Sequence, residues 1–81
     1  MKVTAIRREK NMQDGTGVFR VIIDYHISED RPRTATMFYD IFTGESTFED
    51  ASQARAHISA AEALYEIAAA YMTLVYYGLE H

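Results

Sequence analysis

Apolar and polar residues alternate over much of the first 45 residues, which is the pattern of β-strands with one buried face. A first strand is predicted over residues 2–10. The clearest alternation runs over residues 18–28, and its apolar face carries Phe19, Val21, Ile23, Tyr25 and Ile27. A third strand is predicted over residues 34–43, with an apolar face made of Ala35, Met37, Tyr39 and Ile41.

Turn-forming residues separate these segments. Residues 11–17 contain Asp14-Gly15, a dipeptide typical of hairpins. Residues 28–33 form a polar loop around the single proline, and residues 43–46 form a further turn. Thr47 and Phe48 can add a short pairing segment after it. Short connections of this kind favour a three-stranded antiparallel meander, since strands adjacent in sequence usually pair.

The last third of the chain predicts one long helix from Asp50 to Gly78. Nine of the twenty residues in 51–70 are alanine, the strongest helix former. Asp50 is a suitable N-cap, and Gln53 three residues later completes a capping-box pattern. Gly78 suits the position just past a helix end. The predicted fold is therefore α+β in class, with the order β-β-β-α.

The helix has a narrow polar stripe and a wide apolar surface. At 100° per residue the stripe collects Ser52, Arg55, Ser59, Glu62, Glu66 and Thr73. The opposite surface, suited to a sheet, collects Ala54, Ile58, Ala61, Leu64, Tyr65, Ile67, Ala68, Met72 and Val75. His57 lies beside this apolar surface, where a histidine is ordinarily partly buried and hydrogen-bonded.

Length and composition indicate one domain over residues 1–78. Residues 79–81, Leu-Glu-His, resemble the remnant of a purification tag, and we expect them to lie outside the domain. The chain has no cysteine, which excludes disulfides and thiolate metal sites. No secretion signal is recognised at the start, and Glu62 and Glu66 argue against a membrane span, so a cytoplasmic protein is expected.

The helix surface predicts self-association. A helix of some 27 residues spans ~40 Å at 1.5 Å per residue, whereas strands of nine residues span only ~30 Å. The last turns should therefore overhang the sheet, and small residues elsewhere should let a second helix approach closely. We expect a homodimer, or a contact with another protein, through Ala56, Ala60, Ala63, Tyr71, Leu74, Tyr76 and Tyr77.

Residues able to do chemistry are few, and no catalytic, metal-binding or cofactor-binding set is predicted. Glu62 and Glu66 form an i, i+4 carboxylate pair that is best explained as a solvated helix face. Asp24 and His26 lie on one strand face, but two ligands are too few for a metal, and a base needs convergent partners. We therefore expect a small, non-enzymatic interaction protein of accessory or regulatory type.

Nucleic-acid binding is the alternative. Residues 1–33 hold seven basic against five acidic residues, whereas residues 34–78 hold one basic against six acidic residues. Basic side chains beside aromatic residues on a sheet are used by several nucleic-acid-binding folds. The predicted architecture also resembles, in outline, the arm-binding domains of phage-type integrases. The residues expected to contact phosphates under this alternative are Arg7, Arg8, Arg20, Arg31 and Arg33.

Overall fold

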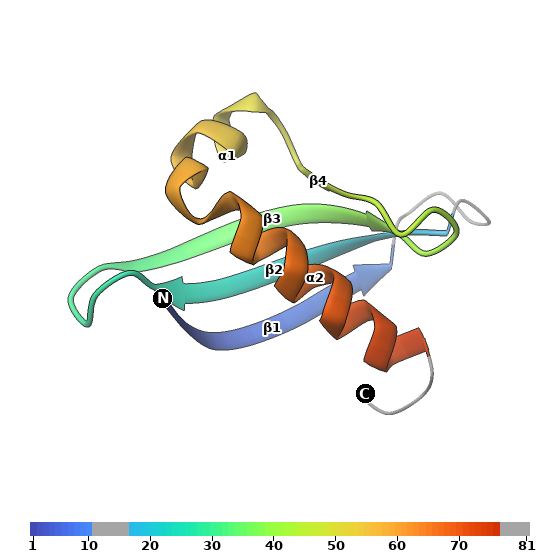
Figure 1. Ribbon diagram of the computed structural model, residues 1–81, viewed down its shortest axis with the longest axis horizontal. Coiled ribbons are helices and arrows are strands. Elements are labelled where there is room, and N and C mark those ends of the chain that lie inside the picture. The colour runs from blue at the N-terminus through green and yellow to red at the C-terminus, as the bar shows by residue number, and fades with distance from the viewer. Residues whose placement is uncertain (11–16, 77–81) are drawn as a thin grey trace.

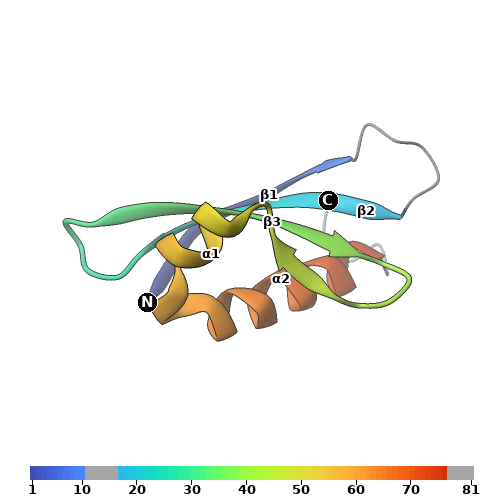
Figure 2. The same cartoon turned by 90° about the horizontal axis from the view of Figure 1, so that it is seen from above.

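The computed structural model describes residues 1–10 and 17–76 of the 81. Four antiparallel strands form one sheet in the order β1-β2-β3-β4, and a helical segment follows them. Figure 1 shows α2 crossing one face of the sheet diagonally, and Figure 2 shows the other face uncovered by it. The strands and helices are β1 (Lys2–Lys10), β2 (Val18–His26), β3 (Pro32–Asp40), β4 (Ser46–Phe48), α1 (Ala51–Ala56), a 3-10 turn (Ile58–Ala60) and α2 (Ala61–Tyr76).

The α+β class and the antiparallel meander are confirmed, with four strands rather than three. The fourth is the short β4, whose Phe48 lies opposite Met37 of β3. β1 keeps its predicted bounds, but β2 ends two residues early at His26. β3 begins two residues early at Pro32 and ends three residues early at Asp40, so Ile41 lies beyond the strand. The Asp14-Gly15 turn and the Gly78 stop lie outside the described residues.

The core lies between one face of the sheet and α2. The predicted alternation is confirmed, because Val21, Ile23 and Tyr25 of β2 are buried on this face. β3 and α2 supply the remaining buried apolar side chains, namely Ala35, Met37, Tyr39, Leu64, Ala68 and Met72. Ile27, which was predicted to extend the β2 face, is 48% exposed, because the strand has already ended.

The prediction of one continuous helix is wrong. α1 ends at Ala56, the 3-10 turn follows, and α2 starts at Ala61 in a different direction (Figure 1). The backbone of His57 has φ −115° and ψ 19°, outside helical values, and its side chain is held in the core. Ile58 and Ala54, predicted to face the sheet, are therefore exposed, and Ile58 is 77% exposed.

The predicted N-cap is confirmed at Asp50, whose Oδ1 accepts a hydrogen bond of 2.9 Å from the Gln53 N–H. The reciprocal half of the capping box is absent from the described contacts of Gln53. Its Oε1 instead accepts from the Thr36 N–H of β3 at 3.1 Å. Gln53 thus ties α1 to the sheet at the point where β4 has ended.

Asp50→Ala should lower the free energy of unfolding by about 0.5–2 kcal/mol, because it leaves the first-turn N–H groups without their side-chain acceptor. Urea denaturation followed by circular dichroism measures the change. Asp50→Asn keeps a capping oxygen and should stay within a few tenths of a kcal/mol of the parent. Equal losses in the two variants would contradict a capping role.

Candidate interaction surfaces

The open face of the sheet carries a network of ion pairs. Arg20 of β2 contacts Glu9 of β1 and Glu49 beyond β4, each at 3.1 Å. Hydrogen bonds with Glu49 and Glu9 raise the pKa of Arg20, which stays charged. Arg7 of β1 lies 3.3 Å from Asp24 of β2. Basic charge on this face is therefore matched by acidic neighbours rather than presented free.

The register of the strands brings the members of this ion-pair network together. Glu9 is opposite Arg20 across β1 and β2, and Arg7 lies diagonally from Asp24. The second Asp24 carboxylate oxygen accepts from the Thr34 hydroxyl at 2.7 Å. Beneath the charged side chains, Ile22 is only 4% exposed although α2 covers the other face. Long side chains can shield apolar surface in this way while their charged ends stay in water.

The five arginines proposed for phosphate contact do not share one surface. Arg7 and Arg20 lie on the open face, each in an ion pair. Arg8 points to the helix side, where it donates to the Tyr71 hydroxyl at 3.3 Å. Arg33 donates to the Ala56 carbonyl at 3.0 Å, and Arg31 is exposed in the β2–β3 turn. A concentrated basic footprint, which nucleic-acid binding requires, does not form from these residues.

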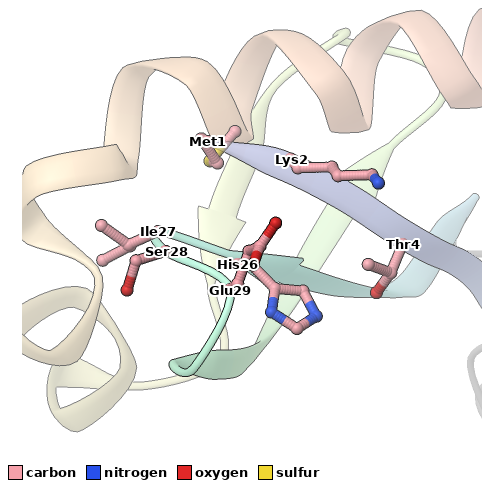
Figure 3. Close-up of a pocket in the computed structure, with 7 residues that line it drawn as sticks. All are labelled: Met1, Lys2, Thr4, His26, Ile27, Ser28 and Glu29. Atoms are coloured by element: carbon pink, nitrogen blue, oxygen red, sulfur yellow. The ribbon is translucent and has the colours of Figure 1, made fainter.

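A hollow of about 330 Å³ lies where β1 begins and β2 ends (Figure 3). Lys2, His26, Ile27 and Glu29 are among its lining residues. The Nδ1 atom of His26 is shielded from solvent and has no hydrogen-bond partner among the described residues. Asp24, which shares a strand face with His26, is committed to Arg7 and Thr34. Within the described residues no three acidic, histidine or cysteine side chains gather to hold a metal.

His57 is the residue that fixes the helix break. Its ring is 4% exposed, and its Nδ1 lies 2.6 Å from the Tyr25 hydroxyl oxygen. The Phe48 ring stacks on it with centroids 6.0 Å apart and an angle of 14°. Burial lowers the pKa of His57, the Arg33 guanidinium lowers it further, and a backbone hydrogen bond with Thr34 opposes both. The site is a structural anchor with a neutral imidazole.

The predicted helix interface is divided by the break. Ala56 is exposed on α1, whereas Ala60 lies in the 3-10 turn and packs against the core. Tyr71 is half-buried, packs against the core and accepts a hydrogen bond from Arg8. Leu74 is 44% exposed and Ala63 is half-buried on α2. The Tyr76 side chain and Tyr77 lie outside the described part of the structure.

Four of the α2 residues make a seam along one side of the helix, and we name Ala63, Ile67, Ala70 and Leu74 the α2 seam. Their spacing of four, three and four residues is that of the a and d positions of a helix–helix contact. Ala70 and Leu74 are exposed, and Ala63 and Ile67 are half-buried. Ala63 and Leu74 belong to the interface predicted from the sequence, whereas Ile67 was predicted to face the sheet and also packs against the core.

One stretch of the described chain, Ile58–Val75, is long and apolar enough to cross a membrane by length and composition. Leu64, Ala68 and Met72 within it are buried against the sheet. A core helix passes the same test, so this finding adds little to a membrane assignment. Compared with models of protein families, with curated proteins and with solved structures, the chain matches none.

Proposed function

We propose that this protein is a small, non-enzymatic interaction module that self-associates through the α2 seam. The observation that carries the proposal is the exposure of Ala70 and Leu74 at a–d spacing with Ala63 and Ile67. A seam of this spacing fits a second helix, and alanine at two of its four positions permits an axial separation near the short end of about 8–10 Å.

An antiparallel arrangement of two copies fits the side-chain sizes best. It places Leu74 of one copy opposite Ala63 of the other, and Ile67 opposite Ala70, so a large side chain meets a small one at each level. A parallel arrangement would instead oppose alanine with alanine at Ala63 and Ala70, and isoleucine or leucine with itself at the other two positions. Isologous contacts of this kind close into a dimer and do not propagate into fibres.

Leu74→Glu should convert the dimer into a monomer, because it places a charge within an apolar helix contact, at both ends of the antiparallel seam. Light scattering after size exclusion, at several concentrations, measures the mass. Since Leu74 is exposed in the single chain, the fold should persist, and circular dichroism checks this. Ala60→Glu is a poorer test, because Ala60 packs against the core of its own chain.

Ser52→Glu is the matched control. It adds the same charge at an exposed position of α1, where an acid in the first turn is favourable. The control should keep the dimer mass. A parent protein that is monomeric at every concentration, or a Leu74→Glu variant of unchanged mass, would rule out this interface.

A further inference from the structure

β1 is the outer strand of the sheet and has a long free side. It runs for nine residues, whereas β4 at the other edge has only three. Its one irregularity is a register shift between Val3 and Ala5, so the ladder with β2 is regular from Ala5 onward. No described strand pairs with its outer side. Exposed edges of this length are usually protected or used for pairing.

The direction of the β1 backbone groups follows from hydrogen bonds on the far side of the sheet. The Thr36 carbonyl accepts from the Glu49 N–H, and the Thr36 N–H donates to Gln53, so both groups point away from β2. Ile22 is opposite Thr36. In an antiparallel ladder the backbone groups of successive residues alternate in direction, so those of Ile22 point toward β1.

The same alternation continues across β1. Arg7 is opposite Ile22, so its N–H and carbonyl bond to β2. The backbone groups of Ile6 and Arg8, on either side of Arg7, therefore point outward at the free edge. A strand added there would find donors and acceptors at alternate residues, which is the arrangement used in β-strand addition.

The side chains of β1 define the chemistry of such a strand. On the helix side, Val3 and Ile6 are half-buried and pack against the core, leaving apolar surface beside the edge. On the open side, the Arg7 side chain is 59% exposed despite its ion pair with Asp24. A neighbouring strand would therefore place apolar residues beside Ile6 and acidic residues beside Arg7.

A second copy of β1 does not suit this edge. The strand holds four basic residues against Glu9, a net charge of +3, so two copies lying side by side would repel each other overall. An acidic segment would have the opposite effect. Charge complementarity therefore selects a different chain over self-pairing.

We propose that the outer edge of β1 binds an extended protein segment that alternates apolar and acidic residues, adding a fifth, antiparallel strand to the sheet. This binding site would supply the proposed interaction module with a class of partner, and in that respect it rests on the proposed function. The site itself does not involve the α2 seam. Backbone hydrogen bonds to Ile6 and Arg8 supply affinity, and contacts with Ile6 and Arg7 supply selectivity.

The test uses the full chain and a capped peptide of about eight residues that alternates valine and glutamate. Isothermal titration calorimetry measures binding, and amide hydrogen exchange measures protection. The peptide should bind and slow the exchange of the Ile6 and Arg8 amides, whereas the Arg7 amide is already bonded to β2. Replacing every glutamate by lysine should weaken binding at least about tenfold, because the like charges then face β1.

Backbone methylation of the peptide provides the sharper control. In an antiparallel pairing the residues that bond to Ile6 and Arg8 have side chains on the same side as theirs, which is the valine side. Peptides N-methylated at valine should therefore lose binding at least about tenfold, and those N-methylated at glutamate should keep most of it.

Three results would overturn the proposal: no binding at about 1 mM peptide, equal binding of the lysine peptide, or equal binding of the two methylated peptides. The result is separable from that of the self-association test. Leu74→Glu leaves β1 unchanged and should bind the valine–glutamate peptide as the parent does. Peptide binding by a monomeric parent would likewise support the β1 site while contradicting the dimer.

Discussion

Leu64→Ala should lower the free energy of unfolding by about 2–5 kcal/mol, among the largest effects of any single substitution in this chain. Leu64 is fully buried in the first turn of α2 and belongs to the cluster that joins the helix to β2 and β3. Its truncation removes apolar burial and leaves a cavity, and both effects destabilise the native state. Urea denaturation with an unchanged m-value measures the loss.

Ile58→Ala is the comparison variant for Leu64→Ala. A straight helix places both Ile58 and Leu64 on the sheet-facing surface, whereas the observed break leaves Ile58 77% exposed. The Ile58 substitution should therefore stay within about 0.5 kcal/mol of the parent, as surface changes do. A loss as large as that of Leu64→Ala would mean that Ile58 is buried and that the helix is continuous.

The strands could be predicted because their information is local. Alternation over residues 18–28 and 34–43 correctly identified six core side chains, but it wrongly included Ile27; the six are Val21, Ile23, Tyr25, Ala35, Met37 and Tyr39. A half-buried strand has to alternate, since successive side chains point to opposite faces. The short β4 was the weakest signal, because three residues contain too little alternation to separate a strand from a turn.

The helix break could not be predicted in the same way. Alanine-rich sequence on both sides of His57 favours an uninterrupted helix, and neither proline nor glycine interrupts it. The break depends on contacts from distant parts of the chain, namely Tyr25 of β2, Phe48 of β4 and Arg33 of β3. Tertiary packing outweighs local propensity at this point.

The positions of the five arginines could not be predicted for a related reason. Counting charges along the sequence gives an excess of basic residues in the first part but cannot say which acids lie beside them. The register places Glu9 opposite Arg20 and brings Arg7 into an ion pair with Asp24. Faces and ion pairs are fixed by strand pairing, so a candidate site spread over several strands is uncertain until the register is known.

His57→Ala should lower the free energy of unfolding by at least about 1–3 kcal/mol, because it leaves the buried Tyr25 hydroxyl without its partner. The lost ring adds a cavity beside Phe48, which increases the effect. The double variant Tyr25→Phe with His57→Phe should lose less stability than the sum of the losses of Tyr25→Phe and His57→Phe alone, since it removes both partners of this hydrogen bond together. Additive losses in urea denaturation would show that the hydrogen bond contributes nothing.

The same contact should make the fold sensitive to acid. Because burial and Arg33 lower the pKa of His57 in the folded state, the unfolded chain takes up this proton first, as the pH falls through the ordinary value of 6.5. Stability rises with pH wherever the unfolded state binds more protons. The contribution of His57 is therefore complete above pH 6.5 and is progressively lost below it, until the folded pKa is reached.

The charged and titratable groups around the ring agree with this direction. Arg33 opposes a second positive charge, and burial raises the pKa of Tyr25, so its hydroxyl keeps its proton and donates it to neutral Nδ1. A protonated Nδ1 cannot accept that proton. Urea midpoints should decrease as the pH is lowered through the acid range, both in the parent and in His26→Gln. They should fall less in His57→Phe, and parallel curves for all three proteins would exclude His57 as the source.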